Sequence, residues 1–231
     1  MKKFHYYSTL ADLFRYPGED FTEQLDAINV VLSVNYPEAE VELKPFVDHM
    51  KSISQDQREE LFTKTFDVQP LCYLDLGYVI FGEDYKRGAF LLHMQQEQAV
   101  IGNDCGSDLS DNICNMLTLF SKSDNDALLD DLGANIMIPG LKKMLSEFET
   151  ARIELKQKVL RKLHSALISE ELNYGNVYRN AINALLIVFE KDFGTKQTIS
   201  SKEDSYYGVS GSDSFFRKRS DIELENNHKL D

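Results

Sequence analysis

Positive charge, tryptophan and proline are all scarce in this chain of 231 residues. It contains no Trp, 5 Pro and 3 Cys, and its 25 Lys and Arg face 38 Asp and Glu, which gives a net charge of −13. Binding to phosphate requires a basic surface, so this balance argues against nucleic acid or an anionic membrane as the main partner. A partner that carries positive charge is favoured.

The sequence also shows no segment of the kind that directs a chain to a membrane. The opening residues, MKKFHYYSTLADLF, lack the apolar core and the small-residue cleavage site of a signal peptide. No stretch approaches the roughly 20 apolar residues that span a bilayer. Cys72, Cys105 and Cys114 form no CxxC pair and no disulfide framework. We therefore expect a cytoplasmic protein without stable membrane association.

Motifs of common enzymes are not found either. The sequence has no P-loop, no GxGxxG, no GxSxG and no HExxH. His93 and Glu97 are four residues apart and could form half of a metal site on one helix face, but no second such pair supplies more ligands. We expect an ordinary surface pair, no catalytic residue and no metal site. A helical metalloenzyme that uses this pair with nearby aspartates is an alternative.

What the sequence does contain is helical periodicity over most of its length. Apolar residues recur at spacings of three and four, as at Ile113, Met116, Leu117 and Phe120, and no segment reads as a sheet. The expected helices cover about residues 7–16, 23–32, 41–53, 54–66, 83–100, 113–120, 123–148, 155–173 and 177–193, with an interruption at Pro139. The sequence therefore predicts an all-α fold, a single globular helical bundle domain over residues 1–194.

The composition changes after Gly194. Residues 195–231 are rich in Ser, Asp, Lys and Gly and show no sustained periodicity, so we expect a mostly disordered C-terminal tail. This tail has six basic and seven acidic residues, so the acidity belongs to residues 1–194. Part of it is local, because seven aspartates and one lysine lie between Ile101 and Asp131. Beside a binding site, this acidic region would attract a basic peptide at long range.

In one segment the least polar stretch of the chain is followed directly by its densest cluster of charged residues. Residues 66–82, FDVQPLCYLDLGYVIFG, are followed at once by EDYKRG at 83–88. Pro70, Gly77 and Gly82 predict that the first stretch breaks the helical pattern. Two interpretations are open: a buried connector before a solvated helix start, or a peptide-binding groove with aromatic residues for the apolar side of a ligand and carboxylates for its basic ends.

The order of residues in this segment resembles the characteristic block of the NarJ-type chaperones, the nitrate reductase delta-subunit family, which belongs with the TorD/DmsD-type redox enzyme maturation proteins. The matching residues are ELFTKTFD at 60–67, PLC at 70–72, Leu74, GY at 77–78, FGE at 81–83 and KRG at 86–88. Three flanking motifs agree: LADLFRYP at 10–17, DLSDN at 108–112 and NVY at 176–178. In the second of these, Ser110 and Asn112 stand where the family usually has Pro and His. The resemblance covers roughly residues 5–193.

This resemblance implies a cytoplasmic, all-helical assembly chaperone of the TorD-like type that catalyses no reaction. Such chaperones bind the immature catalytic (alpha) subunit of a molybdenum oxidoreductase, often through its N-terminal peptide. They support insertion of the molybdenum cofactor, bis-molybdopterin guanine dinucleotide, which the client carries and the chaperone does not bind stably. A monomer or a dimer is compatible with the sequence, and a permanent structural subunit of a redox complex is a second alternative.

We expect the partner-binding groove to be formed by this segment and the loop before Ile113. Its apolar side would be lined by Phe66, Pro70, Tyr73, Leu74, Tyr78 and Phe81, although Tyr78 and Phe81 are also compatible with burial in the core. Asp75, Glu83, Asp84 and Asp111 are the candidate contacts for basic residues of the client. Arg87 would orient those carboxylates, and Asn112 belongs to the expected site because it replaces the family's His.

Overall fold

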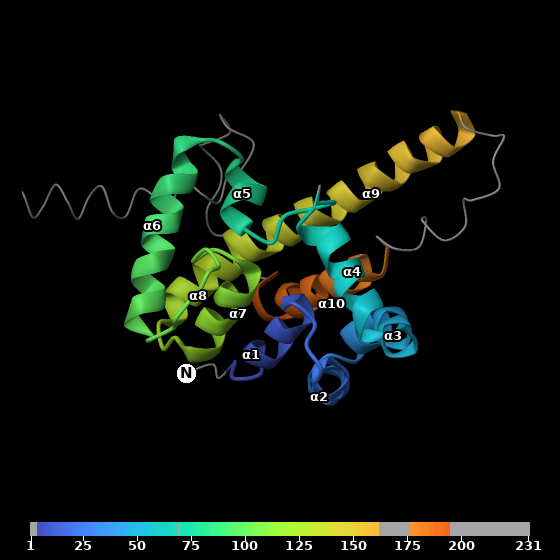
Figure 1. Cartoon of the computed structure of the whole chain (residues 1–231). Coiled ribbons are helices and arrows are strands. Elements are labelled where there is room, and N and C mark those ends of the chain that lie inside the picture. The colour runs from blue at the N-terminus through green and yellow to red at the C-terminus, as the bar shows by residue number, and fades with distance from the viewer. Residues whose placement is uncertain (1–3, 69, 162–175, 195–231) are drawn as a thin grey trace, which may run out of the picture.

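The computed structural model describes residues 4–68, 70–161 and 176–194, and most of these residues are helical (Figure 1). Within these ranges no strand occurs, and the one β-type contact is an isolated antiparallel bridge between Asp75 and Asn112. The all-α prediction is therefore confirmed. The tail expected over residues 195–231 lies outside the described residues.

Within the described ranges the longest connection between helices, residues 101–112, precedes α7. In chain order they are α1 (Tyr7–Leu10), the 3-10 turn η1 (Ala11–Phe14), α2 (Phe21–Asn35), α3 (Pro37–Ser52), α4 (Gln55–Phe66), α5 (Leu76–Phe81), α6 (Tyr85–Val100), α7 (Ile113–Lys122), α8 (Asp126–Leu132), the π-helical turn η2 (Gly133–Met137), α9 (Ile138–Arg161) and α10 (Asn176–Phe193). None of the described helices combines the length and the hydropathy that crossing a bilayer requires.

Two helix starts have the local causes that the sequence indicates. Ser54 caps α4: its hydroxyl accepts a hydrogen bond from Gln57 N–H at 3.4 Å, and Gln57 Oε1 accepts one from Ser54 N–H at 2.9 Å. This reciprocal arrangement is a capping box. Pro37 opens α3, where its missing N–H leaves no helical hydrogen bond unmade.

The structure corrects the prediction that residues 66–82 are non-helical throughout. Residues Leu76–Phe81 form α5, although Gly77 lies inside this short helix. A Cβ at position 77 would lie 2.5 Å from Asp111 Oδ2 and 3.0 Å from Phe90 Cδ1. Glycine is therefore required here by close packing between distant segments, and it does not mark a break in the chain.

The structure also corrects the interruption predicted at Pro139. The irregular part is the π-helical turn η2, and α8, η2 and α9 follow one another without a gap, so Pro139 lies within a continuous helical run directly after the π-helical turn. Helix α9 then runs without a break from Ile138 to Arg161, so the prediction of separate helices ending at 148 and starting at 155 is wrong. The remainder of the predicted helix, 162–173, lies outside the described residues.

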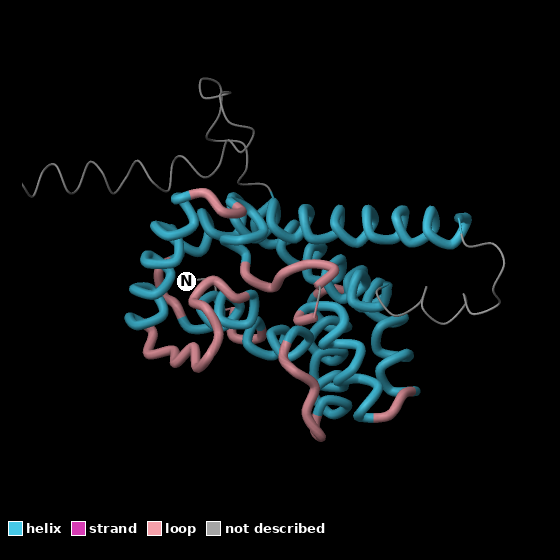
Figure 2. The backbone as a smooth tube through the Cα atoms, turned by 45° about the horizontal axis from the view of Figure 1, so that its top comes forward, coloured by secondary structure: helices cyan, strands magenta, loops and turns pink. Residues whose placement is uncertain are grey.

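Helices α9 and α10 form the centre of the arrangement. Figure 1 shows α9 running diagonally across the molecule with α10 beneath it, and α10 packs against both α3 and α9. The N-terminal elements α1 and η1 pack on α7, while α6 lies at the edge beside α5 (Figures 1 and 2). The segment that resembles the chaperone block thus runs from the second half of α4 through α5 to the start of α6, and α5 packs on α9.

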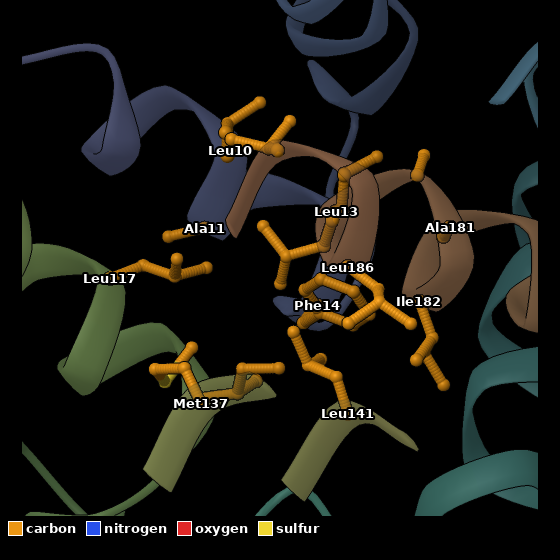
Figure 3. Close-up of a cluster of buried hydrophobic side chains, with 14 of the residues drawn as sticks. Leu10, Ala11, Leu13, Phe14, Leu117, Met137, Leu141, Ala181, Ile182 and Leu186 are labelled. Carbon is orange, nitrogen blue, oxygen red and sulfur yellow. The ribbon is translucent and has the colours of Figure 1, made fainter. Parts of the chain in front are cut away.

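The core joins residues from both ends of the described chain. Figure 3 shows Leu13 and Phe14 of η1 beside Leu141 of α9 and Ile182 of α10, all of them at most 1% exposed. Burying each side chain of this size contributes about 1.5–3 kcal/mol relative to exposure. The apolar residues predicted to face inward on α4, α7 and α10 are indeed buried: Leu61, Phe62, Phe66, Ile113, Met116, Leu117, Phe120, Ile182, Leu185, Leu186 and Phe189.

Candidate functional site

Two segments that are far apart in the sequence meet at the start of α5. The N–H of Ile113 donates a hydrogen bond to Leu74 C=O at 2.9 Å, and the N–H of Leu76 donates one to Asp111 C=O at 3.1 Å. These two bonds form the bridge that sets Asp75 opposite Asn112. The Asn112 side-chain amide also lies 3.4 Å from Asp75 Oδ1 and donates to it. The backbone therefore brings the apolar segment and the 108–112 loop together, as the expected site requires.

Asp111 is the most unusual residue of this contact. It is fully buried; its Oδ2 accepts a hydrogen bond from Gly77 N–H at 2.7 Å, whereas its Oδ1 has no hydrogen-bond partner within the described part of the chain. Burial, followed by repulsion from Asp75, raises the pKa of Asp111 to about 6, against the lowering effects of Gly77 N–H and Arg87. One carboxylate oxygen thus lacks the donor that a buried charge needs.

Arg87 acts on both carboxylates through its charge. Its guanidinium carbon lies 5.0 Å from the centroid of the Tyr78 ring, in a cation–π contact. Its Nε is buried and has no hydrogen-bond partner among the described residues. Burial raises the pKa of Asp75, while Asn112 and Arg87 lower it. Arg87 is therefore close enough to both aspartates to lower their pKa values, and its orienting function stays a prediction.

Exposed aromatic surface lies next to these charges. The Tyr73 ring is 41% exposed and meets the Tyr78 ring edge-on, with 4.3 Å between their centroids. Tyr73, burial and the charge of Glu83 raise the pKa of Tyr78, so Glu83 also acts on this position. We use the name bridge site for the set formed by Tyr73, Asp75, Tyr78, Glu83, Arg87, Asp111 and Asn112.

Other predicted site residues lie elsewhere or have a structural function. Phe66 is 7% exposed and its ring centroid lies 4.7 Å from that of Tyr178, so it belongs to the core and offers no surface to a peptide. Phe81 is half-buried and packs against Phe90, with ring centroids 5.7 Å apart. Pro70 and Leu74 are also half-buried, and Leu74 contributes its carbonyl to the bridge.

Two polar residues of the predicted site cap helices. Asp84 is exposed and accepts a hydrogen bond from Lys86 N–H at 2.9 Å, which caps α6. Asn112 Oδ1 accepts one from Cys114 N–H at 3.0 Å, which caps α7. Asn is among the residues that are most favoured at the N-cap position of a helix. Asn112 therefore has a structural function in this chain as the N-cap of α7.

A second polar cluster, which the sequence did not predict, surrounds the carboxylate of Asp192. Tyr7, Tyr36 and Tyr6 all donate to Asp192 Oδ2, at 2.8, 2.6 and 3.3 Å, and the hydroxyls of Tyr6 and Tyr36 also hydrogen-bond each other. Burial is the main reason that the pKa of Tyr6 rises to about 12, and it raises those of Tyr7 and Tyr36 as well. The cluster ties α1 and the α2–α3 junction to the end of α10. Nothing in the spacing of these residues predicts it, since it joins positions up to 186 residues apart.

The alternative metal site involves only a pair of side chains. His93 Nε2 and Glu97 Oε1 lie 3.1 Å apart on α6. Over the described ranges, no group of three or more His, Cys, Asp or Glu side chains is arranged to hold a metal ion.

Comparison with known proteins assigns no family to this chain. No protein-family model matches the chain, and no curated protein matches it. The interpretation of the bridge site therefore depends on its own residues and on the resemblance of their order to the NarJ-type block.

Proposed function

We propose that this protein is a cytoplasmic assembly chaperone with a TorD-like helical fold. It would bind the immature catalytic subunit of a molybdenum oxidoreductase through a basic N-terminal peptide and keep that subunit competent for cofactor insertion. It would neither catalyse a reaction nor bind the cofactor stably. The observation that carries this proposal is the pairing of Asp75 with Asn112, which joins the two segments that resemble separate motifs of NarJ-type chaperones.

The chemistry of the bridge site supports a basic peptide as its ligand. Asp75 is half-buried and Glu83 is exposed, so both carboxylates are accessible to a ligand, and the buried Asp111 adds negative charge behind Asp75. A guanidinium or ammonium group would pair with the accessible carboxylates. Tyr73 offers an exposed ring for an apolar residue of the same peptide. The net charge of −13 would accelerate encounter with a basic partner, most strongly at low salt.

The first experiment identifies the client. The tagged full chain is purified from its own host, and bound proteins are identified by mass spectrometry and assayed for molybdopterin. We expect a molybdoenzyme catalytic subunit that lacks its cofactor. Recovery of this chain as a stoichiometric part of the mature, cofactor-loaded complex would instead identify it as a structural subunit. A stoichiometric metal bound to the purified chain would favour the metalloenzyme alternative.

The second experiment tests the site. Calorimetry measures binding of the N-terminal peptide of that catalytic subunit to the full chain and to the double variant Asp75→Lys, Glu83→Lys. We expect the variant to bind at least about tenfold more weakly, a loss of about 1.4 kcal/mol, with unchanged helicity by circular dichroism. The matched control is Glu19→Lys, Asp124→Lys, which makes the same charge change at two exposed positions. Equal affinity of the site variant and the wild type would refute this site.

A further inference from the structure

Helix α6 has an outward face without charge. Eight of its 16 residues are exposed, and none of the eight is charged. The charged residues of the helix, Lys86, Arg87 and Glu97, are all half-buried. The solvent side of a surface helix normally consists of charged and polar residues, and 27% of this chain is charged. We use the name α6 face for the eight exposed residues: Tyr85, Gly88, Ala89, Leu92, Gln95, Gln96, Ala99 and Val100.

The α6 face also presents large apolar side chains at the edge of the molecule, where Figure 1 shows α6. Tyr85, Leu92 and Val100 are 83%, 53% and 81% exposed. They follow one another after seven and eight residues, so they lie along one stripe of the helix. Phe90 and Met94 are buried on the side of α6 that packs in the protein. Single exposed apolar residues are normal, but a continuous uncharged stripe of them indicates an interaction surface.

Gly88 is independent evidence that a second molecule approaches this face closely. It is the fourth residue of α6, and a Cβ at this position would meet no atom within 4 Å. Glycine inside a helix costs about 0.5–1 kcal/mol relative to alanine. Packing within the described part of the chain therefore does not account for Gly88, in contrast to Gly77. Close contact with another helix would account for it.

We propose that the α6 face is the contact surface of a weak homodimer, in which α6 packs antiparallel on α6 of a second copy. A two-fold contact brings the same surface of both copies together, so a charge near the axis faces its own copy. Each copy has a net charge of −13, and the uncharged α6 face lets two copies meet without like charges in contact. A basic client would be attracted by carboxylates, and an anionic membrane by Lys or Arg, and the face has neither.

The sizes of the side chains along the α6 face are complementary to themselves in this arrangement. With Leu92 on the two-fold axis, residues whose numbers add up to 184 lie at the same height on the two helices. The facing pairs combine a large and a small side chain: Tyr85 with Ala99, Gln96 with Gly88, and Gln95 with Ala89. Alternation of large and small residues lets facing helices interdigitate.

The size of the contact determines the expected affinity. A helix of 16 residues is about 24 Å long and about 10 Å wide, which is smaller than the interface of a permanent dimer. We expect a reversible dimer with a dissociation constant of roughly 10–100 μM. A dimer of this kind does not require the proposed function. Because Glu83 and Arg87 lie at the start of α6, antiparallel packing would place the two bridge sites at opposite ends of the helix pair.

Sedimentation equilibrium of the full chain tests the dimer at physiological salt. We expect the wild type to associate reversibly between about 1 and 200 μM. Leu92→Glu and Leu92→Lys should each weaken association at least about tenfold, because both substitutions place like charges on the axis. Val34→Glu is the matched control, since it makes the same charge change at an exposed valine of α2. It should associate like the wild type, and circular dichroism should show unchanged helicity for all three variants.

Several results would overturn the inference. A wild-type chain that stays monomeric at the highest concentration has no such dimer. A dimer that Val34→Glu weakens and Leu92→Glu does not weaken uses another surface. A monomeric wild type that loses its client or its binding to lipid vesicles through Leu92→Glu would assign the α6 face to that client or to a membrane. The proposed function is tested separately, because it depends on client-peptide binding at Asp75 and Glu83.

Disulfide trapping tests the antiparallel order. Cys105→Ser removes the one cysteine that is not buried. In this background, a Tyr85→Cys chain and an Ala99→Cys chain with tags of different mass are mixed and mildly oxidised. We expect the mixed disulfide as the main product, because facing positions of two packed helices lie within the range that a disulfide bridges. Disulfides of Tyr85→Cys with itself as the main product would indicate parallel packing and contradict the proposal.

Discussion

The backbone N–H of Gly77 donates a 2.7 Å hydrogen bond to Oδ2 of Asp111, a residue 34 positions later in the chain. A Cβ at position 77 would lie 2.5 Å from that same oxygen, so this approach depends on the absence of a side chain. The bond fixes the first turn of α5 against the loop that precedes α7. The geometry of the bridge site therefore depends on one glycine and one buried aspartate.

Replacing Gly77 with alanine should destabilise the fold. The added Cβ would collide with Asp111 Oδ2 and Phe90 Cδ1, and overpacking of this kind costs about 1–3 kcal/mol. Gly88 provides the matched control, because a Cβ there meets no atom within 4 Å inside helix α6. Gly88→Ala should stabilise the protein by about 0.5–1 kcal/mol. Urea unfolding measures both, and equal effects of the two substitutions would contradict the packing argument.

Asp111 should make the stability of the protein depend on pH. Its pKa is about 6 in the folded state against an ordinary value of 3.8, so the folded state favours the protonated form. The contribution of the protonated Asp111 carboxyl to the free energy of unfolding is complete below about pH 4. It is lost as the pH rises through 6, and the free energy of unfolding falls by roughly 3 kcal/mol. Asp111→Asn keeps an acceptor for Gly77 N–H without the charge. We expect it to raise the free energy of unfolding at pH 7 by about 1–2 kcal/mol.

The comparison that isolates this effect is the pH profile of the free energy of unfolding. Between pH 4 and pH 7 the Asp111→Asn profile should be flatter than that of the wild type, with a residual slope from Asp75, whose pKa is also raised. Asp124→Asn, which removes one carboxylate at an exposed position, is the control for the loss of one negative charge. A wild-type protein that is equally stable at pH 4.5 and pH 7 would show that ionisation of the buried Asp111 carboxyl does not destabilise the fold.

Asp192 should be important for stability through the three tyrosines that it binds. Asp192→Ala removes the acceptor of Tyr7, whose side chain is fully buried, and of the hydroxyls of Tyr6 and Tyr36. Leaving such donors unsatisfied should cost about 2–4 kcal/mol. The nearby Glu190→Ala breaks an exposed ion pair with Lys142 and should cost less than about 1 kcal/mol. Thermal unfolding of the two variants gives the comparison, and a loss for Asp192→Ala no larger than for Glu190→Ala would contradict it.

The three cysteines should differ in reactivity. Cys72 and Cys114 are buried, and burial raises the pKa of Cys72 strongly and that of Cys114 to about 12, so few thiolates form. Cys105 is partly exposed. A thiol reagent at pH 8 should therefore modify Cys105 first in the native protein and all three cysteines in denaturant. Rapid native labelling of Cys72, confirmed by peptide mapping, would show that the segment before α5 opens.

The positions of most helices could be predicted from the sequence because their causes are local. The apolar spacing of α7 and α10 and the cap at Ser54 involve residues within a few positions of one another. One error occurred where a distant contact outweighed a local signal, and another where a local irregularity took a different form. Gly77 suggested a break, yet Asp111 and Phe90 explain why glycine occurs inside a helix there. Pro139 also suggested a break, but the helical run continues past it, and the irregularity is the π-helical turn η2 directly before it.

The candidate site was predictable as a set of residue types and not as a set of contacts. The sequence drew attention to Asp75, Arg87 and Asp111, which the structure brings together. It also drew attention to Phe66, which is in the core, and to Asp84, which caps α6. Whether an aromatic ring is exposed or buried depends on which helix packs over it, and apolar character alone cannot distinguish the two.

The sequence by itself determined the helical class of this protein, the faces that its helices bury and the negative charge of residues 1–194. Each of these follows from composition or from spacing along one helix, where neighbours are fixed by the geometry of the chain. Only the tertiary structure decided that Asp75 faces Asn112, that Gly77 holds Asp111 and that three tyrosines share Asp192. These contacts depend on how separate helices pack, and the spacing of residues along the chain does not encode that packing.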